Sequence, residues 1–332
     1  MRRMMKAGGW PSIVTTYLFG VFAIVTMVRL IPLQLDIAQK TGATAAQFGL
    51  LIGLAGLPAA VLATVSGAVV DRFGPRTVLI GGALGITITS IAAALASSYL
   101  QFAILRLLEG VALVGLFTAG PVLLMRTTSG RRQAVAMTFW STMSPVGVAL
   151  GFETGGAFAR TPLWYVAFLI SGAALFALAA VALCLPEGGA SSRPAPTLRE
   201  QGTQLLQGYK QSGPLRLAFV YVLSGSTALG IDTVITSYIA NTHRISVSSA
   251  AELTAGAALV MIGGALLVGA VLGRGYSPFR LCAPIALAAS IFGSLIFVPA
   301  CPLLLVGAAL CGWFFALGAA MALIFAIIPR VA

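Results

Sequence analysis

Five ionisable residues stand inside long apolar stretches of this sequence: Arg29, Arg106, Glu109, Glu153 and Asp232. A charged side chain at the centre of a lipid-embedded helix costs about 2.5–3.5 kcal/mol, so such residues usually pair, face water or do chemistry. An arginine in that setting can bind an anion, and a carboxylate can accept and release a proton. We therefore treat these five residues as candidates for a substrate or proton site.

Arg106 and Glu109 are the most informative of the five because they lie three positions apart, on one face of a helix. Helical rise places Glu109 roughly 15 Å from the outer end of its stretch, near the middle of a bilayer. One interpretation is a site that binds an anion at Arg106 and titrates a proton at Glu109. The other is a structural Arg–Glu pair that neutralises itself.

The remaining three candidates lie on other stretches. Arg29 falls roughly 8 Å from an outer end, where it either attracts an anion or extends its head group to the interface. Asp232 falls about 12 Å from an outer end and is a candidate proton or cation site. Glu153 is shallower and adjoins a glycine-rich stretch.

The elements that carry these residues follow from composition. The chain has 332 residues, of which 59% are hydrophobic and 8% charged, with a mean hydropathy of +1.00. A soluble protein needs more charge than this for its surface. About 20 apolar residues form a helix that crosses a bilayer, and the runs do not alternate with period two as barrel strands do. We predict an all-α membrane helix bundle with ten helices, near residues 12–34, 47–70, 77–97, 100–125, 133–158, 162–185, 214–240, 250–272, 281–299 and 302–328.

The net charge of +12 is typical of nucleic-acid binding, but the placement of the cations predicts topology instead. With a cytoplasmic N-terminus, 15 Lys and Arg fall in inside segments, and only Lys40, Arg160 and Arg244 fall outside. This bias is what the positive-inside rule requires. Trp10 and Trp164 also fall at expected interfaces. We expect a multi-pass protein of a cell membrane, bacterial and inner, with both termini in the cytoplasm and no nucleic-acid partner.

One polar segment interrupts the apolar rhythm and predicts the domain organisation. Residues 186–213 are rich in Gly, Ser and Pro, as linkers are. We therefore predict a six-helix bundle over 1–185, a cytoplasmic linker over 186–213 and a four-helix, incomplete bundle over 214–332. The second helix of each half ends similarly, in Gly67-Ala-Val-Val-Asp71-Arg72 and Gly269-Ala-Val-Leu-Gly273-Arg274, which favours a parallel repeat.

Three motifs indicate a family. Gly67, Asp71, Arg72, Gly74 and Arg76 follow the pattern G-x-x-x-D-R-x-G-R-[RK] after the second helix, with Pro75 in place of the first basic residue. On the fourth helix, Arg106 and Gly110 match R-x-x-x-G. On the fifth helix, Gly147, Gly151, Gly155 and Gly156 match most of G-x-x-x-G-P-x-x-G-G, although Phe152 replaces the proline.

These residues resemble the major facilitator superfamily, and Trp140-Ser-Thr-Met-Ser-Pro145 is similar to its cyanate and nitroimidazole permease branch. The resemblance implies a bundle that carries a solute by alternating access, with the Asp71–Arg72 motif as a conformational switch. It also implies twelve helices where we count ten, so we expect that the C-terminal pair is missing and that transport competence depends on it. The small-residue spacing on the fifth helix predicts close helix packing.

The function hypotheses are accordingly three. The first is a proton-coupled secondary transporter of a small polar or anionic solute. The second is a drug/proton antiporter, favoured by the partial glycine motif. The third is a truncated membrane protein that does not transport. No P-loop and no His, Cys or carboxylate cluster occurs, so we expect no enzyme activity, no metal and no cofactor. The expected partners are the lipid bilayer and a small-molecule substrate, with the chain a monomer.

Overall fold

The computed structural model describes residues 5–188 and 212–331, and within them every regular element is a helix. Contacts divide the chain into two compact units, Met1–Leu198 and Arg199–Ala332. Most of the predicted linker, residues 189–211, lies outside the described part of the chain.

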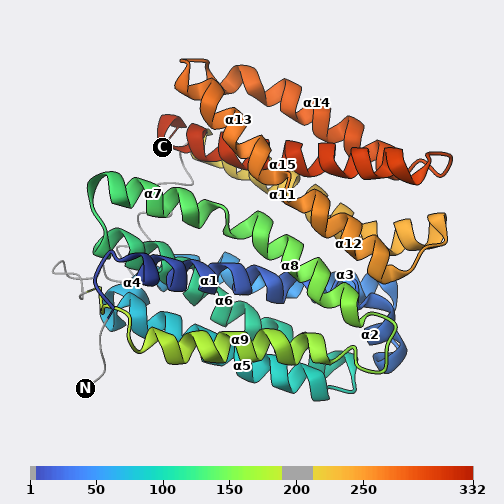
Figure 1. The fold of residues 1–332 in the computed structure, drawn as a ribbon, viewed down its shortest axis with the longest axis horizontal. Helices are drawn as coiled ribbons and strands as arrows, with labels where there is room; N and C mark the ends of the chain where they lie inside the picture. Colours follow the sequence, from blue (N-terminus) through green and yellow to red (C-terminus); the bar gives the residue numbers. More distant parts are fainter. Residues whose placement is uncertain (1–4, 189–211, 332) are drawn as a thin grey trace. The chain divides into compact units, whose positions relative to one another are not determined.

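The first unit contains nine of the described helices (Figure 1). They are α1 (Trp10–Val28), α2 (Gln34–Thr41), α3 (Ala45–Leu54), α4 (Leu57–Phe73), α5 (Pro75–Leu95), α6 (Tyr99–Thr127), α7 (Gly130–Ser141), α8 (Met143–Phe158) and α9 (Val166–Ala182). The second unit contains α11 (Ser212–His243), α12 (Val247–Ala258), α13 (Met261–Gly273), α14 (Pro278–Ile296) and α15 (Leu303–Val331). These helices occupy all ten of the predicted ranges.

Several predicted helices are broken, which is why the structure has more helices than the ten expected. A tight turn follows α1, and Pro32 lies within it. The break between α3 and α4 falls at Ala55 and Gly56, directly before Pro58 in the first turn of α4. The break between α7 and α8 falls at Thr142, shortly before Pro145. Proline lacks the N–H that would continue the helix, so three of the breaks have a local cause.

The fourth break, between α12 and α13 at Leu259 and Val260, has no proline. Other prolines remain inside continuous helices, namely Pro121 in α6 and Pro284 in α14. In a membrane bundle, neighbouring groups re-satisfy the backbone that such a proline frees. Proline position alone therefore does not determine where these helices break.

Length and apolar composition qualify eight helical stretches of the described residues as membrane spans. The helix Val166–Ala182 is apolar but shorter than those eight. Large apolar side chains lie exposed along these stretches, for example Leu95 on α5 and Leu304 on α15. Exposed apolar side chains in such numbers are unfavourable in water and suit contact with lipid.

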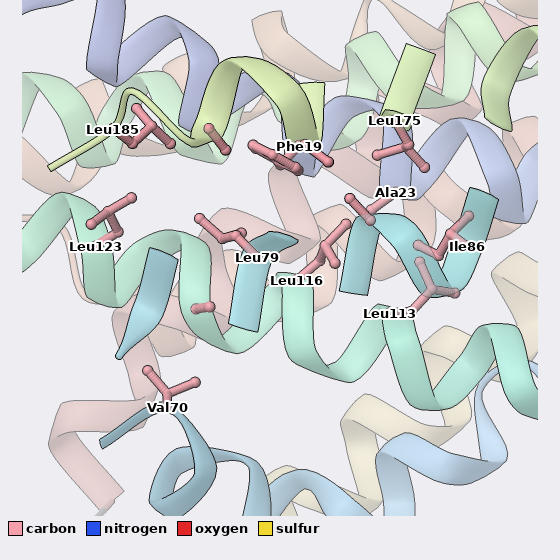
Figure 2. Packing of buried hydrophobic residues seen from close by; sticks show 14 of the residues in the cluster. Phe19, Ala23, Val70, Leu79, Ile86, Leu113, Leu116, Leu123, Leu175 and Leu185 are labelled. Atoms are coloured by element: carbon pink, nitrogen blue, oxygen red, sulfur yellow. The ribbon is translucent and has the colours of Figure 1, made fainter. Parts of the chain in front are cut away.

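The core of the first unit is formed by aliphatic side chains from helices far apart in sequence. Figure 2 shows Phe19 and Ala23 from α1 converging with Leu79 from α5, Leu116 from α6 and Leu175 from α9. Because lipid is as apolar as leucine, contacts of this kind stabilise the bundle through close packing. This packing sets the distance at which the polar side chains of α1, α5 and α6 meet.

Candidate functional site

Three of the five candidate residues meet in one buried cluster inside the first unit. The Arg106 guanidinium donates to one carboxylate oxygen of Glu109, with Nη1 and Oε2 2.5 Å apart. The Arg29 guanidinium approaches the other oxygen, with Nη2 and Oε1 3.4 Å apart. Arg29 is fully buried, and Arg106 and Glu109 are 2% and 4% exposed. One carboxylate thus serves two arginines that lie 77 residues apart in sequence.

The break between α3 and α4 helps to position Arg106. Because α3 stops at Leu54, carbonyl groups of its last turn lack their usual helical donors, and Arg106 Nε donates to the Leu51 carbonyl at 3.1 Å. One turn further along α6, Gly110 lies so close to Ala55 and Pro58 that a side chain there would clash. Arg106 and Gly110, which form the R-x-x-x-G motif, therefore hold α6 against this break.

Two further side chains surround Arg29. Its Nη2 donates to the Ser90 hydroxyl on α5 at 3.0 Å, and its guanidinium carbon lies 4.7 Å from the centre of the Phe168 ring on α9. A cation over an aromatic face is attracted to the ring, more strongly when water is excluded. Arg29 stands at the C-cap of α1, and not inside the helix as the sequence predicted.

The electrostatics of this cluster are unbalanced. Two guanidinium groups face one carboxylate, so the ionised cluster carries one excess positive charge. Three of its buried donors, Arg29 Nε, Arg29 Nη1 and Arg106 Nη2, have no hydrogen-bond partner. A buried charge without compensation is costly, and a buried donor without a partner costs about 1–3 kcal/mol. The cluster therefore offers an excess positive charge and unpaired donors with which an anion could pair.

The other two candidates do not join this cluster. Glu153 lies exposed on α8 and forms none of the ion pairs found among the described residues. Asp232 belongs to α11 of the second unit, where its buried Oδ1 has no hydrogen-bond partner. The Trp313 indole N–H on α15 approaches this carboxyl without completing a well-formed hydrogen bond. Asp232 is thus a separate acidic position.

The predicted switch motif lies where α4 ends and α5 begins. Asp71 accepts a hydrogen bond from Arg126 at the end of α6. Arg76 donates to the Leu185 carbonyl at 2.9 Å and to the Glu187 carboxylate at 3.0 Å. Gly74 links the two helices at φ +80°, which side chains disfavour.

The other two motif residues have fewer contacts. Arg72 is exposed, with its guanidinium 5.5 Å from the centre of the Phe73 ring. A side chain at Gly67 would have no neighbour within 4 Å. The ties at this end of the unit therefore run from Asp71 and Arg76 to α6 and to the residues that follow α9.

The glycine motif of α8 faces α1, which lies alongside it in Figure 1. A side chain at Gly147 would meet Ile24 at 2.5 Å, and one at Gly151 would meet Val28 at 2.6 Å. At Gly155 the obstacle is the Arg29 carbonyl, and Gly156 is buried beside it. The glycines bring α8 against the end of α1 that carries Arg29.

Sequence reasoning missed several partners. Ser90 and Phe168 contact Arg29, and Arg126 and Glu187 complete the ties of the switch motif. Arg126 had one available signal, since it is a cation in the last turn of a helix beside the acidic motif. The contacts of Ser90 and Phe168 depend on how α5 and α9 pack, and no local pattern marks them.

Comparison with known proteins shows one family. A family model described as the Major Facilitator Superfamily matches residues 9–332. Among curated proteins, MdtD of Salmonella paratyphi B, which is named as a multidrug resistance protein, is 28% identical over 115 residues. That match spans 35% of this chain and 24% of the relative, so it concerns about a quarter of the longer protein.

Solved structures with the same fold are more distant in sequence. A bacterial homologue of the human lysosomal transporter Spinster superposes with a TM-score of 0.81 at 15% identity, over 96% of this chain and 74% of that one. The nucleoside transporter NupG gives 0.77 at 13% identity, over 97% and 84%. A D-xylose–proton symporter gives 0.69 at 14% identity, over 96% and 82%. At such identities the likeness shows the fold alone.

Proposed function

Because the chain belongs to the Major Facilitator Superfamily, a family of multi-pass membrane transporters and not of enzymes, we propose that it moves a small polar or anionic solute across a membrane, coupled to protons. The membrane helices found in the structure suit this family. Family membership alone does not specify the solute or the coupling ion, and the proposal names a class for the first and the proton for the second. It also includes alternating access, in which the site opens first to one side of the membrane and then to the other.

The observation that carries the proposal is the sharing of Glu109 by Arg29 and Arg106. Ionised Glu109 occupies one donor of each arginine and cancels one of the two charges. Protonated Glu109 loses its negative charge, which leaves two positive charges and weakens both ion pairs. An anion bound to the arginines would then restore the balance. Binding of the proton and binding of the anion therefore favour each other.

This reciprocity gives a reason for coupling. If protonation strengthens anion binding, then a bound anion strengthens proton binding by the same factor. A proton and a monovalent anion that bind together add no net charge to the site, which lowers the electrostatic cost of carrying the anion across the apolar layer. The cluster lies within the first unit, so the movement that exposes it must loosen contacts of α1 or α6. The glycine-lined contact of α1 with α8 is suited to small sliding movements.

The ties at the other end of this unit have a different proposed role. Asp71–Arg126 joins α4 to α6, and Arg76 joins α5 to the residues following α9. We infer that they keep these helix ends together, so that the first unit moves as a rigid body. The cation distribution supports cytoplasmic termini. We further propose that the membrane is a bacterial inner membrane and that the chain is a monomer.

The test is proton-linked uptake by the purified chain in liposomes that contain a pH-sensitive dye. Cyanate, nitrate and acetate are offered from an acidic exterior. We expect at least one anion to acidify the lumen faster than protein-free liposomes allow, and Glu109→Gln to reduce that rate at least tenfold. Glu252→Gln, an exposed carboxylate on α12, is the matched control and should retain it. Equal rates for Glu109→Gln and the parent would remove Glu109 from the mechanism.

The local similarity to MdtD supports a second candidate, drug/proton antiport. Here Glu109 or Asp232 would exchange a proton for a cationic drug. The same liposomes distinguish the two: under antiport, an inward proton gradient would drive preloaded ethidium out of the lumen. Ethidium movement without any response to the three anions would replace the first proposal by the second. No response to any probe would contradict both.

A further inference from the structure

A second polar site occurs in the first unit, away from the buried cluster. The residues between α8 and α9 and one face of α2 border an open cavity of about 540 Å³, lined by Asp36, Gln39, Lys40, Arg160, Thr161, Pro162 and Trp164. Neither Lys40 nor Arg160 forms a side-chain ion pair with a carboxylate within the described ranges. The predicted topology has only three cations in outside segments, and two of them, Lys40 and Arg160, line this cavity.

The wall of the cavity is held in place by several contacts. The Lys40 ammonium lies 5.3 Å from the centre of the Trp164 ring, and that ring packs edge-on against Tyr165 and Phe168. Arg160 lies in a turn and has φ +63°, a backbone conformation that residues with a side chain rarely adopt. Its backbone N–H donates to both oxygens of Asp36, at 3.2 and 3.1 Å. The strained turn is thereby fixed to α2.

The one carboxylate of the cavity is already engaged. Asp36 is 7% exposed, and both its oxygens accept the Arg160 N–H. Burial raises the pKa of this carboxyl, although the Arg160 N–H and the Arg160 charge lower it in part. Lys40 and Arg160, in contrast, are exposed at the cavity. The accessible charge of the cavity is therefore positive, with the Thr161 hydroxyl and the Gln39 amide as further polar groups.

We propose that this cavity binds a small oxyanion, a carboxylate, sulfate or phosphate group, between the side chains of Lys40 and Arg160. Lysine and arginine are the usual partners of such groups, and a hydroxyl and an amide complete the hydrogen bonding. The oxyanion belongs either to a dissolved solute or to a lipid head group, since the cavity lies at the ends of predicted spans, near the membrane interface. Binding in the cavity does not require that the chain transports anything.

The cavity connects physically with the buried cluster. Lys40 packs on Trp164, Trp164 on Phe168 and Phe168 on Arg29, which pairs with Glu109. An anion that draws Lys40 away from Trp164 would disturb the outer end of this series. The oxyanion site would thus be an outer binding site that a substrate reaches before the buried cluster. Only this role in transport rests on the proposed function.

The experiment measures sulfate binding to the full chain in phosphatidylcholine nanodiscs by tryptophan fluorescence, with chloride at equal ionic strength as the reference. We expect a saturable sulfate response that disappears in Trp164→Phe. Lys40→Gln and Arg160→Gln should each weaken the affinity about tenfold, and Lys40→Arg should retain most of it. The matched control is Arg244→Gln, which removes another exposed arginine with positive φ, in the second unit.

The outcomes separate the possibilities. Competition of sulfate by added phosphatidylglycerol identifies a lipid head group as the occupant, and the absence of competition identifies a dissolved anion. A response that chloride reproduces, or that persists in the Lys40→Gln/Arg160→Gln double variant, overturns the proposal. Because the assay involves no transport, its failure is distinguishable from failure of the liposome experiment.

Discussion

The Arg126 guanidinium at the end of α6 donates to the Asp71 carboxylate near the end of α4, and this ion pair joins two residues that are 55 positions apart in sequence. Asp71 is 34% exposed and Arg126 21%, so water screens the pair substantially. We expect a coupling free energy below about 1 kcal/mol in a double-mutant cycle of Asp71→Asn and Arg126→Gln. Thermal unfolding in detergent measures it. Arg126→Gln alone should cost more than Asp71→Asn, because Arg126 has further interactions.

The buried cluster gives a prediction from charge counting. Glu109→Ala leaves two uncompensated arginines and should destabilise the protein by about 3–5 kcal/mol. Arg29→Met leaves the neutral Arg106–Glu109 pair and should cost much less, although a donor to Ser90 is lost. Denaturation in a mild detergent compares the two variants. If Arg29→Met is as damaging as Glu109→Ala, the excess positive charge has no energetic role.

The contact of α8 with α1 predicts intolerance of even one methyl group. Gly147→Ala would bring a carbon within 2.5 Å of Ile24 Cβ, and we expect a loss of about 1–3 kcal/mol from overpacking. Gly256→Ala in α12 is the matched control, because a side chain there would have no neighbour within 4 Å. This control should be neutral or stabilising by up to about 1 kcal/mol, since alanine favours a helix. Similar melting temperatures for both variants would contradict the packing role.

Asp36 predicts a pH dependence outside the membrane. Burial raises its pKa above 3.8, although the Arg160 N–H and the Arg160 charge lower it in part. Lys40 is the other charged group that lines the same cavity. The folded protein therefore binds this proton more tightly than the unfolded chain does. Its contribution to stability is greatest below pH 3.8 and declines as pH rises through the folded pKa.

The comparison with Asp36→Asn isolates this effect. Relative to that variant, the parent should lose stability as pH rises from 3.8 through the folded pKa of Asp36, because only the parent acquires a buried negative charge. Melting temperatures of both proteins across this range provide the measurement. A parallel pH dependence in the two proteins would show that Asp36 does not titrate in the expected direction.

The sequence predicted the fold class well because the bilayer restricts the choices. Apolar length determines the spans, and the spacing of Arg106 and Glu109 determines that they meet on one helix face. The proline-linked breaks before α4 and α8 also have local signals. Even so, ten unbroken helices were expected, since a proline is also compatible with a continuous helix, as Pro121 in α6 demonstrates.

What sequence could not supply is contact between distant segments. Arg29 reaches Glu109 only because the glycines of α8 and the core of α5, α6 and α9 fix the end of α1 beside α6. No period or motif relates those two positions. The oxyanion cavity was missed for the same reason, since Lys40 and Arg160 were recognised only as isolated outside cations.

The hydrogen bonds of Arg76 have a mechanical consequence. They bind α5 to the Leu185 carbonyl and to Glu187, and Gly188 follows in a left-handed conformation against Pro75 and Leu123. Force applied to the chain beyond residue 188 would therefore load the base of α5 directly, instead of unravelling α9 one turn at a time. The end of the first unit is therefore attached to its other helices, and a force transmitted from the second unit would act on the whole bundle.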